Sequence, residues 1–435
     1  MKVASTRASN VTVSFKEAVF RGLAPDGGLY LPLVQPDLGP VLSGLRPDAS
    51  MSDIARAAMS VFLADELDGE SLDRIAAAAF PFRPELRKLD EGLYLLELFH
   101  GPTFAFKDFG ACFLAAVMEE YLRRDRRRAV ILTATSGDTG SAVASAFHGR
   151  AGIQVVILYP SGRVSPLQEK QLTTLGGNVA ALEIDGSFDD CQRMVKAAFI
   201  DLGGRLGLTS ANSINLGRLI PQAFYYIYGR LRLAAERPGG CVFCVPSGNF
   251  GNLTAGVLAW RWGLPVERFL AATNANKVVP EYLESGVFKP RPSVHTLSNA
   301  MDVGDPSNFE RLEAIFGGDP DAMRAAIEGA WVSDEETAAA IRRWRRERGL
   351  FFDPHTALGV HAAERWLAGP AGKGRTVIAL GTAHPGKFLE VVREAAGEEP
   401  PLPERLARVL TLEKKSIRMS NESDALKKWL LSSFA

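Results

Sequence analysis

The sequence is poor in the features that mark secreted, membrane-bound and nucleic-acid-binding proteins. Its 435 residues include four cysteines, too few for a disulfide framework, and a reducing cytosol accounts for them. No apolar run is long enough to cross a bilayer, and no apolar stretch follows the charged start. Fifty basic residues balance fifty acidic ones, so no net field attracts nucleic acid or an anionic membrane. We therefore expect a cytoplasmic protein whose partner is a small molecule.

Residues at the spacing of metal ligands are also scarce. Cys241 and Cys244 form a C-x-x-C pair, but they lie inside an apolar segment that is typical of a buried strand. A structural zinc site needs a second pair of ligands, and none lies close by in the sequence. We expect two inert core thiols and no metal site.

What the chain does contain is a repeated alternation of segments. Apolar, β-branched runs are each followed by a Gly/Ser-rich turn and an Ala/Leu-rich helical pattern, at residues 129–133, 155–159, 241–245 and 376–380. This alternation predicts an α/β fold with parallel sheets and helices on both faces. Ligands of such sheets bind at the carboxyl ends of the strands, so function is expected in the turns.

The pattern changes along the chain and predicts four regions. They are an N-terminal helical cap (1–95), a smaller mobile α/β domain (96–215), a larger α/β domain with an insertion (216–400) and a charged, mostly helical tail (401–435). The arginine-rich run 123–128 closes a helix, where cations complement the helix dipole, so it is interpreted as a solvated helix end.

Lys107 is unusual because aromatic residues surround it in the sequence. Phe104, Phe106 and Phe109 are its neighbours, and burial among them would disfavour the ammonium form. A lysine with a lowered pKa is the nucleophile that forms Schiff bases with aldehydes. The alternative is a lysine that extends to solvent and pairs with Asp108. Local sequence leaves both interpretations open.

Four polar, glycine-rich turns are candidate binding loops, and three of them follow predicted strands. Residues 246–256 place small residues at a helix start, where converging backbone N–H groups form a site for a single phosphate. Residues 133–142 offer hydroxyls for a second anion such as a carboxylate, and 210–218 offer amides and a guanidinium. Thr382, in the turn 380–386, could offer a hydroxyl to a ring nitrogen. The structural alternative is a plain tight turn for 246–256 and an ordinary capped helix for 133–142 and 210–218, and the turn 380–386 taken alone indicates little.

Two histidines beside prolines, His355 and His384, are candidate acid–base groups. A histidine in such a turn more often has a structural role. We leave both out of the predicted catalytic set.

Taken together, these segments resemble threonine synthase of the longer type found in enteric bacteria and fungi. Matching stretches occur in order almost from end to end, at residues 5–7, 14–18, 22–30, 99–103, 133–140, 157–160, 165–170, 212–215, 247–252, 297–302 and 381–385. The resemblance implies a fold-type II pyridoxal-phosphate enzyme, with two parallel-sheet α/β domains and an N-terminal helical cap.

The resemblance also implies roles for particular residues. Lys107 would be the catalytic lysine and would hold pyridoxal phosphate as a Schiff base. The other predicted cofactor contacts are Gly248, Asn249, Phe250 and Asn252 for the phosphate, Thr382 for the pyridine nitrogen and Asp138 for the phenolic oxygen. The predicted substrate contacts are Thr135, Ser136 and Thr139 for the carboxylate and Asn212, Ser213 and Arg218 for the phosphate. Related fold-type II enzymes often carry asparagine at the position of Asp138.

The family reaction converts O-phospho-L-homoserine and water into L-threonine and phosphate. Two alternatives stay open on the motifs. One is a phospho-lyase that releases 2-oxobutyrate from the same substrate, and the other is a non-catalytic relative that binds the cofactor. We expect a monomer or a homodimer.

Overall fold

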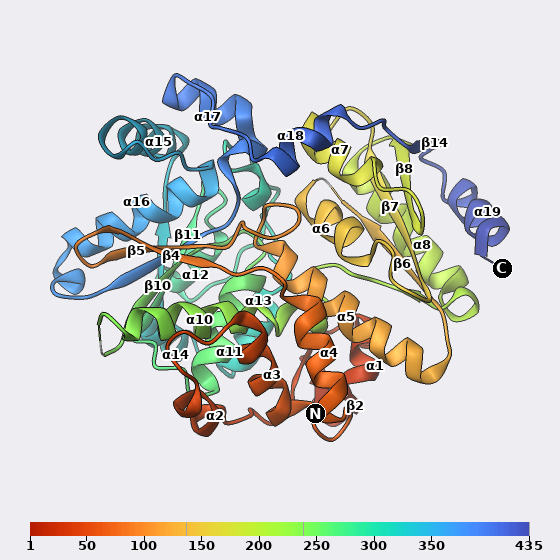
Figure 1. Cartoon of the computed structure of the whole chain (residues 1–435), viewed down its shortest axis with the longest axis horizontal. Helices are drawn as coiled ribbons and strands as arrows, with labels where there is room; N and C mark the ends of the chain where they lie inside the picture. Colours follow the sequence, from red (N-terminus) through yellow and green to blue (C-terminus); the bar gives the residue numbers. More distant parts are fainter. Residues whose placement is uncertain (136, 238, 435) are drawn as a thin grey trace.

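Two largely parallel sheets and one small antiparallel sheet organise the computed structural model, which describes residues 1–135, 137–237 and 239–434 (Figure 1). The six-stranded sheet has the order β12-β11-β10-β13-β5-β4, and all its pairs are parallel except β4–β5. Its strands are β4 (Glu85–Asp90), β5 (Leu93–Glu97), β10 (Val242–Pro246), β11 (Arg268–Thr273), β12 (Ile327–Trp331) and β13 (Val377–Gly381).

The other two sheets are smaller. The five-stranded sheet is parallel throughout, in the order β14-β8-β7-β6-β9, and the three-stranded sheet is antiparallel, in the order β2-β1-β3. Their strands are β1 (Lys2–Ser5), β2 (Thr12–Ser14), β3 (Tyr30–Pro32), β6 (Ala129–Ala134), β7 (Ile153–Pro160), β8 (Val179–Asp185), β9 (Leu208–Thr209) and β14 (Ser416–Ser420).

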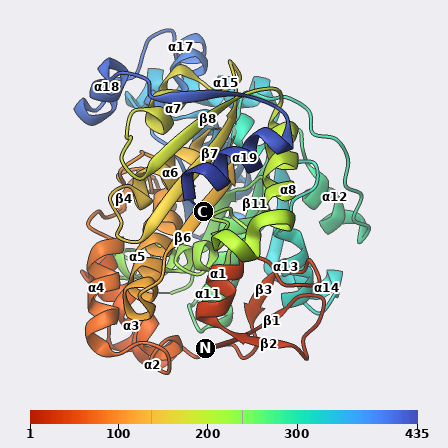
Figure 2. The same ribbon diagram turned by 90° about the vertical axis from the view of Figure 1, so that its right-hand side faces the viewer.

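The central strands of both large sheets are mostly apolar, and helices cover both faces of each sheet. In β10, Phe243 packs toward α10 (Gln222–Ala234) and α11 (Gly251–Arg261), whereas Val242 and Cys244 pack toward α15 (Asp334–Arg348) and α16 (Pro354–Ala368). The five-stranded sheet lies between α5–α7 (Lys107–Asp125, Asp138–Phe147, Pro166–Thr173) and α8 (Phe188–Leu206), and Figure 2 shows α19 (Ser423–Phe434) beside α8. The predicted fold class is confirmed.

The remaining helices cover the ends of the sheets and the N-terminal region. They are α1 (Phe15–Arg21), α2 (Gly39–Gly44), α3 (Met51–Phe62), α4 (Gly69–Ala79), α9 (Leu216–Leu219), α12 (Val278–Ser285), α13 (Phe309–Ile315), α14 (Pro320–Ala326), α17 (Leu389–Ala396) and α18 (Glu404–Thr411), with 3-10 turns η1 (Asn299–Met301), η2 (Pro370–Gly372) and η3 (Pro385–Phe388). None of the described helices combines the length and apolarity that crossing a bilayer requires.

The predicted N-terminal cap and tail are less purely helical than expected. The cap contains β1–β3, and its last residues form β4 and the start of β5, which belong to the six-stranded sheet. The tail contributes β14 to the five-stranded sheet. β4 and β14 were missed because they are edge strands with largely polar, exposed sequences, which lack the apolar pattern of a central strand.

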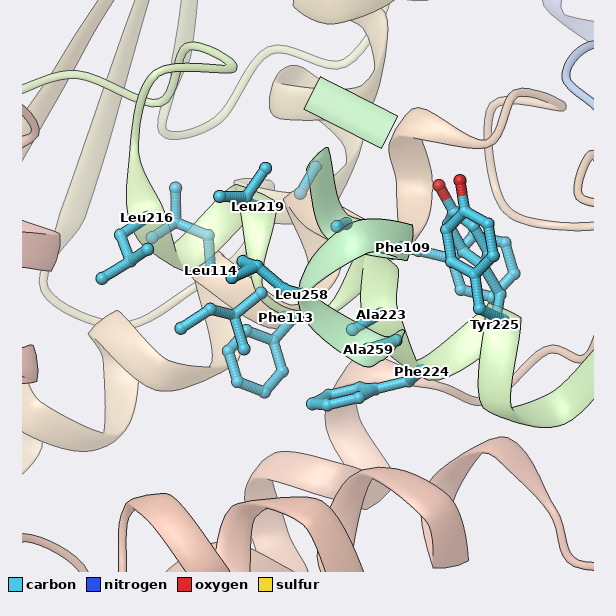
Figure 3. Close-up of a cluster of buried hydrophobic side chains, with 14 of the residues drawn as sticks. Phe109, Phe113, Leu114, Leu216, Leu219, Ala223, Phe224, Tyr225, Leu258 and Ala259 are labelled. Atoms are coloured by element: carbon cyan, nitrogen blue, oxygen red, sulfur yellow. The ribbon is translucent and has the colours of Figure 1, made fainter. Parts of the chain in front are cut away.

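The core beneath α5 holds the start of that helix in place. Phe109 of α5 packs against Tyr225 of α10 with 5.5 Å between ring centroids, and Leu258 of α11 completes the same cluster (Figure 3). The four cysteines are free and buried, and burial raises the pKa of the Cys241 and Cys244 thiols to about 12, as expected for core thiols.

Candidate functional site

The turn before Lys107 is bonded to the turn after β13, although nearly 280 residues separate them. Phe106 N–H donates to Thr382 O at 2.9 Å, and His384 N–H donates to Phe104 O at 3.0 Å. Phe104 adopts a positive φ of 60°, which closes the first turn. Lys107 is the first residue of α5, which starts between the two large sheets (Figure 1). The structure therefore brings Lys107 and Thr382 to one place.

Lys107 lies in a line of alternating charges. Its Nζ is 3.9 Å from Asp138 Oδ2, and the other carboxylate oxygen, Oδ1, is 2.7 Å from the Nζ of Lys387. Burial lowers the pKa of Lys107, although the Asp138 carboxylate opposes the shift. Burial alone would raise the pKa of Asp138, but the positive charge of Lys387 and the hydrogen bonds from Lys387 and Gln168 bring it well below its ordinary value. Asp138 is therefore ionised at neutral pH.

The turn at the start of α11 is closed by its own side chains. Asn252 Oδ1 accepts from Ser247 Oγ and from Leu253 N–H, and Asn252 Nδ2 donates to Pro246 O at 2.8 Å. Phe250 has a positive φ of 60°. Since the first N–H groups of a helix have no partner within it, the backbone at 248–252 offers donors of the kind that bind an anion, and Asn252 shapes the turn.

Asn249 joins this turn to the predicted substrate-phosphate loop. Its Nδ2 donates to Ser213 Oγ at 2.8 Å, and its Oδ1 accepts from Ser307 N–H at 2.6 Å. In the same loop, Asn212 accepts from the Thr133 hydroxyl at the end of β6. Hence two of the predicted anion loops are in direct contact.

The loop that joins β6 to α6 also uses one of its hydroxyls internally. Thr135 Oγ1 accepts from the N–H groups of Gly137 at 3.0 Å and Gly140 at 2.9 Å. Thr139 is partly exposed and lies in the first turn of α6. The predicted contact Ser136 lies outside the described residues.

Arg218 is a buried cation in α9. Its Nη1 donates to Ala211 O at 2.8 Å, its Nε has no partner, and no carboxylate lies within 4.0 Å of its guanidinium in the described ranges. Burial lowers its pKa to about 10, although Asp108 opposes the shift, so it stays positively charged at neutral pH. A Cβ at Gly110 would lie 2.7 Å from Arg218 O, so α9 packs tightly against the first turns of α5.

The hydroxyl of Thr382 shows whether these residues fit pyridoxal phosphate. Its side chain is buried, and Oγ1 has no hydrogen-bond partner among the described residues. A buried hydroxyl without a partner is costly, so it indicates a polar atom that the chain itself does not provide. With the Lys107 amine and the α11 backbone N–H groups, this hydroxyl matches the aldehyde, phosphate and ring nitrogen of that cofactor.

The two histidines have structural contacts. Both ring nitrogens of His355 have partners, Asp353 Oδ1 at 2.8 Å and Ala300 N–H at 3.1 Å. His384 Nδ1 accepts from Gly386 N–H at 3.0 Å, and burial lowers its pKa to about 4.

Sequence reasoning missed Lys387 and Gln168. Lys387 is fully buried, and Gln168 Nε2 donates to Asp138 Oδ1 at 2.9 Å. Lys387 follows a His-Pro-Gly turn, where a lysine is usually solvated, so only the resemblance over 381–385 pointed toward it.

Comparisons with known proteins cover almost the whole chain. Residues 81–382 match the model of the pyridoxal-phosphate dependent enzyme family, 2–80 match the threonine synthase N terminus, and 356–430 match the threonine synthase C-terminal model. The chain is 43% identical over 426 residues to a threonine synthase of Haemophilus influenzae, covering 97% of both proteins.

Solved structures agree with this assignment. A pyridoxal-phosphate-bound threonine synthase from Brucella melitensis superposes with a TM-score of 0.93 at 37% identity, covering 100% of this chain and 99% of that one. The Escherichia coli threonine synthase gives 0.88 at 42% identity, covering 99% and 100%. The chain therefore belongs to the threonine synthase family of pyridoxal-phosphate enzymes.

Proposed function

We propose that this enzyme converts O-phospho-L-homoserine and water into L-threonine and phosphate, with Lys107 as its catalytic lysine. The observation that carries the proposal is the buried Arg218 guanidinium, which lacks a contacting carboxylate in the described part of the chain and packs beside the start of α5. A phosphorylated amino acid needs an anion site besides the one for the cofactor phosphate. Arg218 supplies that second site.

The cofactor contacts follow from the same arrangement. Pyridoxal phosphate, when bound, supplies an aldehyde that condenses with amines and a conjugated ring that delocalises charge from a neighbouring carbon. We assign its phosphate to the backbone of Gly248, Asn249, Phe250 and Asn252, and its ring nitrogen to Thr382. Asp138 would face its phenolic oxygen.

Lys107 has two tasks in this proposal. Because burial favours its neutral amine, Lys107 would hold the cofactor at its aldehyde group and would act as the base that takes protons from Cα and Cβ of the substrate. Arg218, with Asn212 and Ser213, holds the substrate phosphate and stabilises its negative charge as the Cγ–O bond breaks. Thr135, Ser136 and Thr139, with the N–H groups that start α6, hold the substrate carboxylate.

Water must reach Cβ only after phosphate has left. Asp138 and Thr139 belong to the unit of the five-stranded sheet, whereas Thr382 and the α11 turn belong to the six-stranded one. We propose that the smaller unit, residues 96–215, closes over bound substrate and excludes early water.

Product analysis tests this function. The purified protein, loaded with pyridoxal phosphate and given O-phospho-L-homoserine, should release L-threonine and phosphate in equal amounts. Formation of 2-oxobutyrate without threonine would identify a phospho-lyase instead. Cofactor binding with no phosphate release would identify a non-catalytic relative.

A further inference from the structure

Lys387 is a buried lysine close to the proposed catalytic lysine, whose own side chain is partly exposed, and no step of the proposed mechanism uses it. Its side chain is fully inaccessible to solvent in the η3 turn. Its Nζ contacts Asp138 Oδ1 at 2.7 Å and donates to Thr103 O at 2.8 Å. Burying an ammonium group is costly unless a charge and hydrogen bonds compensate, so these contacts define where the side chain lies.

Both contacts of Lys387 lead to Lys107. Asp138 places its other oxygen, Oδ2, 3.9 Å from Lys107 Nζ. Thr103 bonds to Asp108, the residue after Lys107, through its N–H at 2.8 Å and its hydroxyl at 2.5 Å. Lys387 thus touches the carboxylate that faces Lys107 and the turn that positions Lys107.

We propose that Lys387 is a positioning residue that neutralises Asp138 and so leaves the Lys107 amine free of a proton and able to react. A carboxylate facing a lysine across a buried gap stabilises the ammonium form, which is neither nucleophile nor base. Lys387 competes for that carboxylate at a shorter distance and with a direct contact. This inference rests on the proposed role of Lys107.

The charges that face Lys107 come from three elements. Asp138 of α6 is the anion, and Lys387 of η3 and Arg218 of α9 are the cations. Burial is the largest influence and lowers the pKa of Lys107, Asp138 raises it, and Lys387 and Arg218 lower it further. If Lys387 were removed, Asp138 would still raise the pKa of Lys107, and only Arg218 would remain as a cation that lowers it.

A purely structural role for Lys387 makes a different prediction. If Lys387 only tied η3 to Thr103, its loss would weaken the fold without changing the protonation of Lys107 in molecules that stay folded. Lys387→Gln separates the two roles, because the amide still donates hydrogen bonds but carries no charge.

The experiment measures the pKa of the Lys107 amine in the full-length protein after the cofactor is removed. The rate at which Lys107 reacts with an amine-directed reagent is followed against pH by mass spectrometry of the peptide. In K387Q this pKa should rise by about one unit, so that labelling below it slows about tenfold. The exposed Lys373 provides a matched control, since K373Q should leave the value unchanged.

The double variant D138N/K387Q gives the decisive comparison. It removes both charges of the pair, so the pKa of Lys107 should return to the unmodified value or fall below it. D138N alone should lower that pKa, and this variant tests the same balance if K387Q does not fold. Thermal unfolding and the pH dependence of pyridoxal-phosphate uptake accompany each variant.

The inference is overturned if folded K387Q shows the unmodified pKa at Lys107, or if D138N does not lower it. An ordinary lysine pKa at Lys107 in the unmodified protein is a separate result. That outcome would contradict the proposed role of Lys107 itself.

Discussion

Arg218 carries a charge that the described protein does not balance by contact. Replacing it with methionine should raise KM for the phosphorylated substrate about 10- to 100-fold, because a charge-assisted bond to the phosphate is lost. The absorbance of the bound cofactor should stay unchanged. Steady-state kinetics of R218M beside R218K, which keeps the charge, make the measurement. An unchanged KM in R218M would place the substrate phosphate elsewhere.

Replacing Thr382 should affect the stability of the protein differently with and without the cofactor. Its buried hydroxyl has no partner within the described residues, so Thr382→Val should leave the cofactor-free protein as stable as before, or more stable by about 1 kcal/mol. The same change should weaken pyridoxal-phosphate binding about two- to tenfold. Thermal unfolding with and without cofactor measures both effects. Destabilisation of the cofactor-free form would show that the hydroxyl has a structural role.

The sequence singled out Lys107 and did not point to Lys387, and the difference has one physical reason. Lys107 has aromatic neighbours along the chain, and such neighbours predict an enclosed lysine. Lys387 instead contacts Asp138 and Thr103, which lie about 250 and 280 residues away in the sequence. The same limit applies to Asn252. The sequence predicted that Asn252 lies in the turn, but it did not predict that the Asn252 side chain closes that turn.

At the scale of helices and strands, the contact between α5 and α9 sets the distance from Lys107 to Arg218. A methyl group at Gly110 would lie 2.7 Å from Arg218 O, a backbone atom that cannot rotate away. Gly110→Ala should therefore destabilise the protein by about 1–3 kcal/mol and lower kcat/KM, despite the better helix propensity of alanine.

Gly204 in α8 is the matched control for this substitution. It is exposed, and a methyl group there would meet no described atom within 4 Å, so Gly204→Ala should stabilise the protein slightly. Denaturant unfolding of both variants checks the pair. Equal stabilisation by the two substitutions would contradict the tight packing of α5 on α9.

The four strands expected from the sequence are all present, as β6, β7, β10 and β13. They are central strands, and their apolar runs can be recognised from the sequence alone. The strands that escaped prediction include the sheet edges β4 and β14 and the short antiparallel strands near the N-terminus. Their stability comes from pairing with neighbours rather than from their own sequence.

At the scale of the whole molecule, the predicted site residues gather where the two large sheets meet. The loop before α6 and the α11 turn leave different sheets, and the start of α5 lies between them. The sequence predicted the loops, since each follows a strand, but their convergence depends on the topology. Figure 1 shows this arrangement, with the five-stranded sheet to the right of the six-stranded one.

The proposed mechanism depends most directly on which lysine carries the cofactor. Asp138 lies between two lysines, the partly exposed Lys107 and the buried Lys387, so the choice is specific. Borohydride reduction of the pyridoxal-phosphate-loaded protein, followed by peptide mapping, should place the modification on Lys107. Modification of Lys387 or of any other lysine would contradict the role of Lys107 as the catalytic lysine.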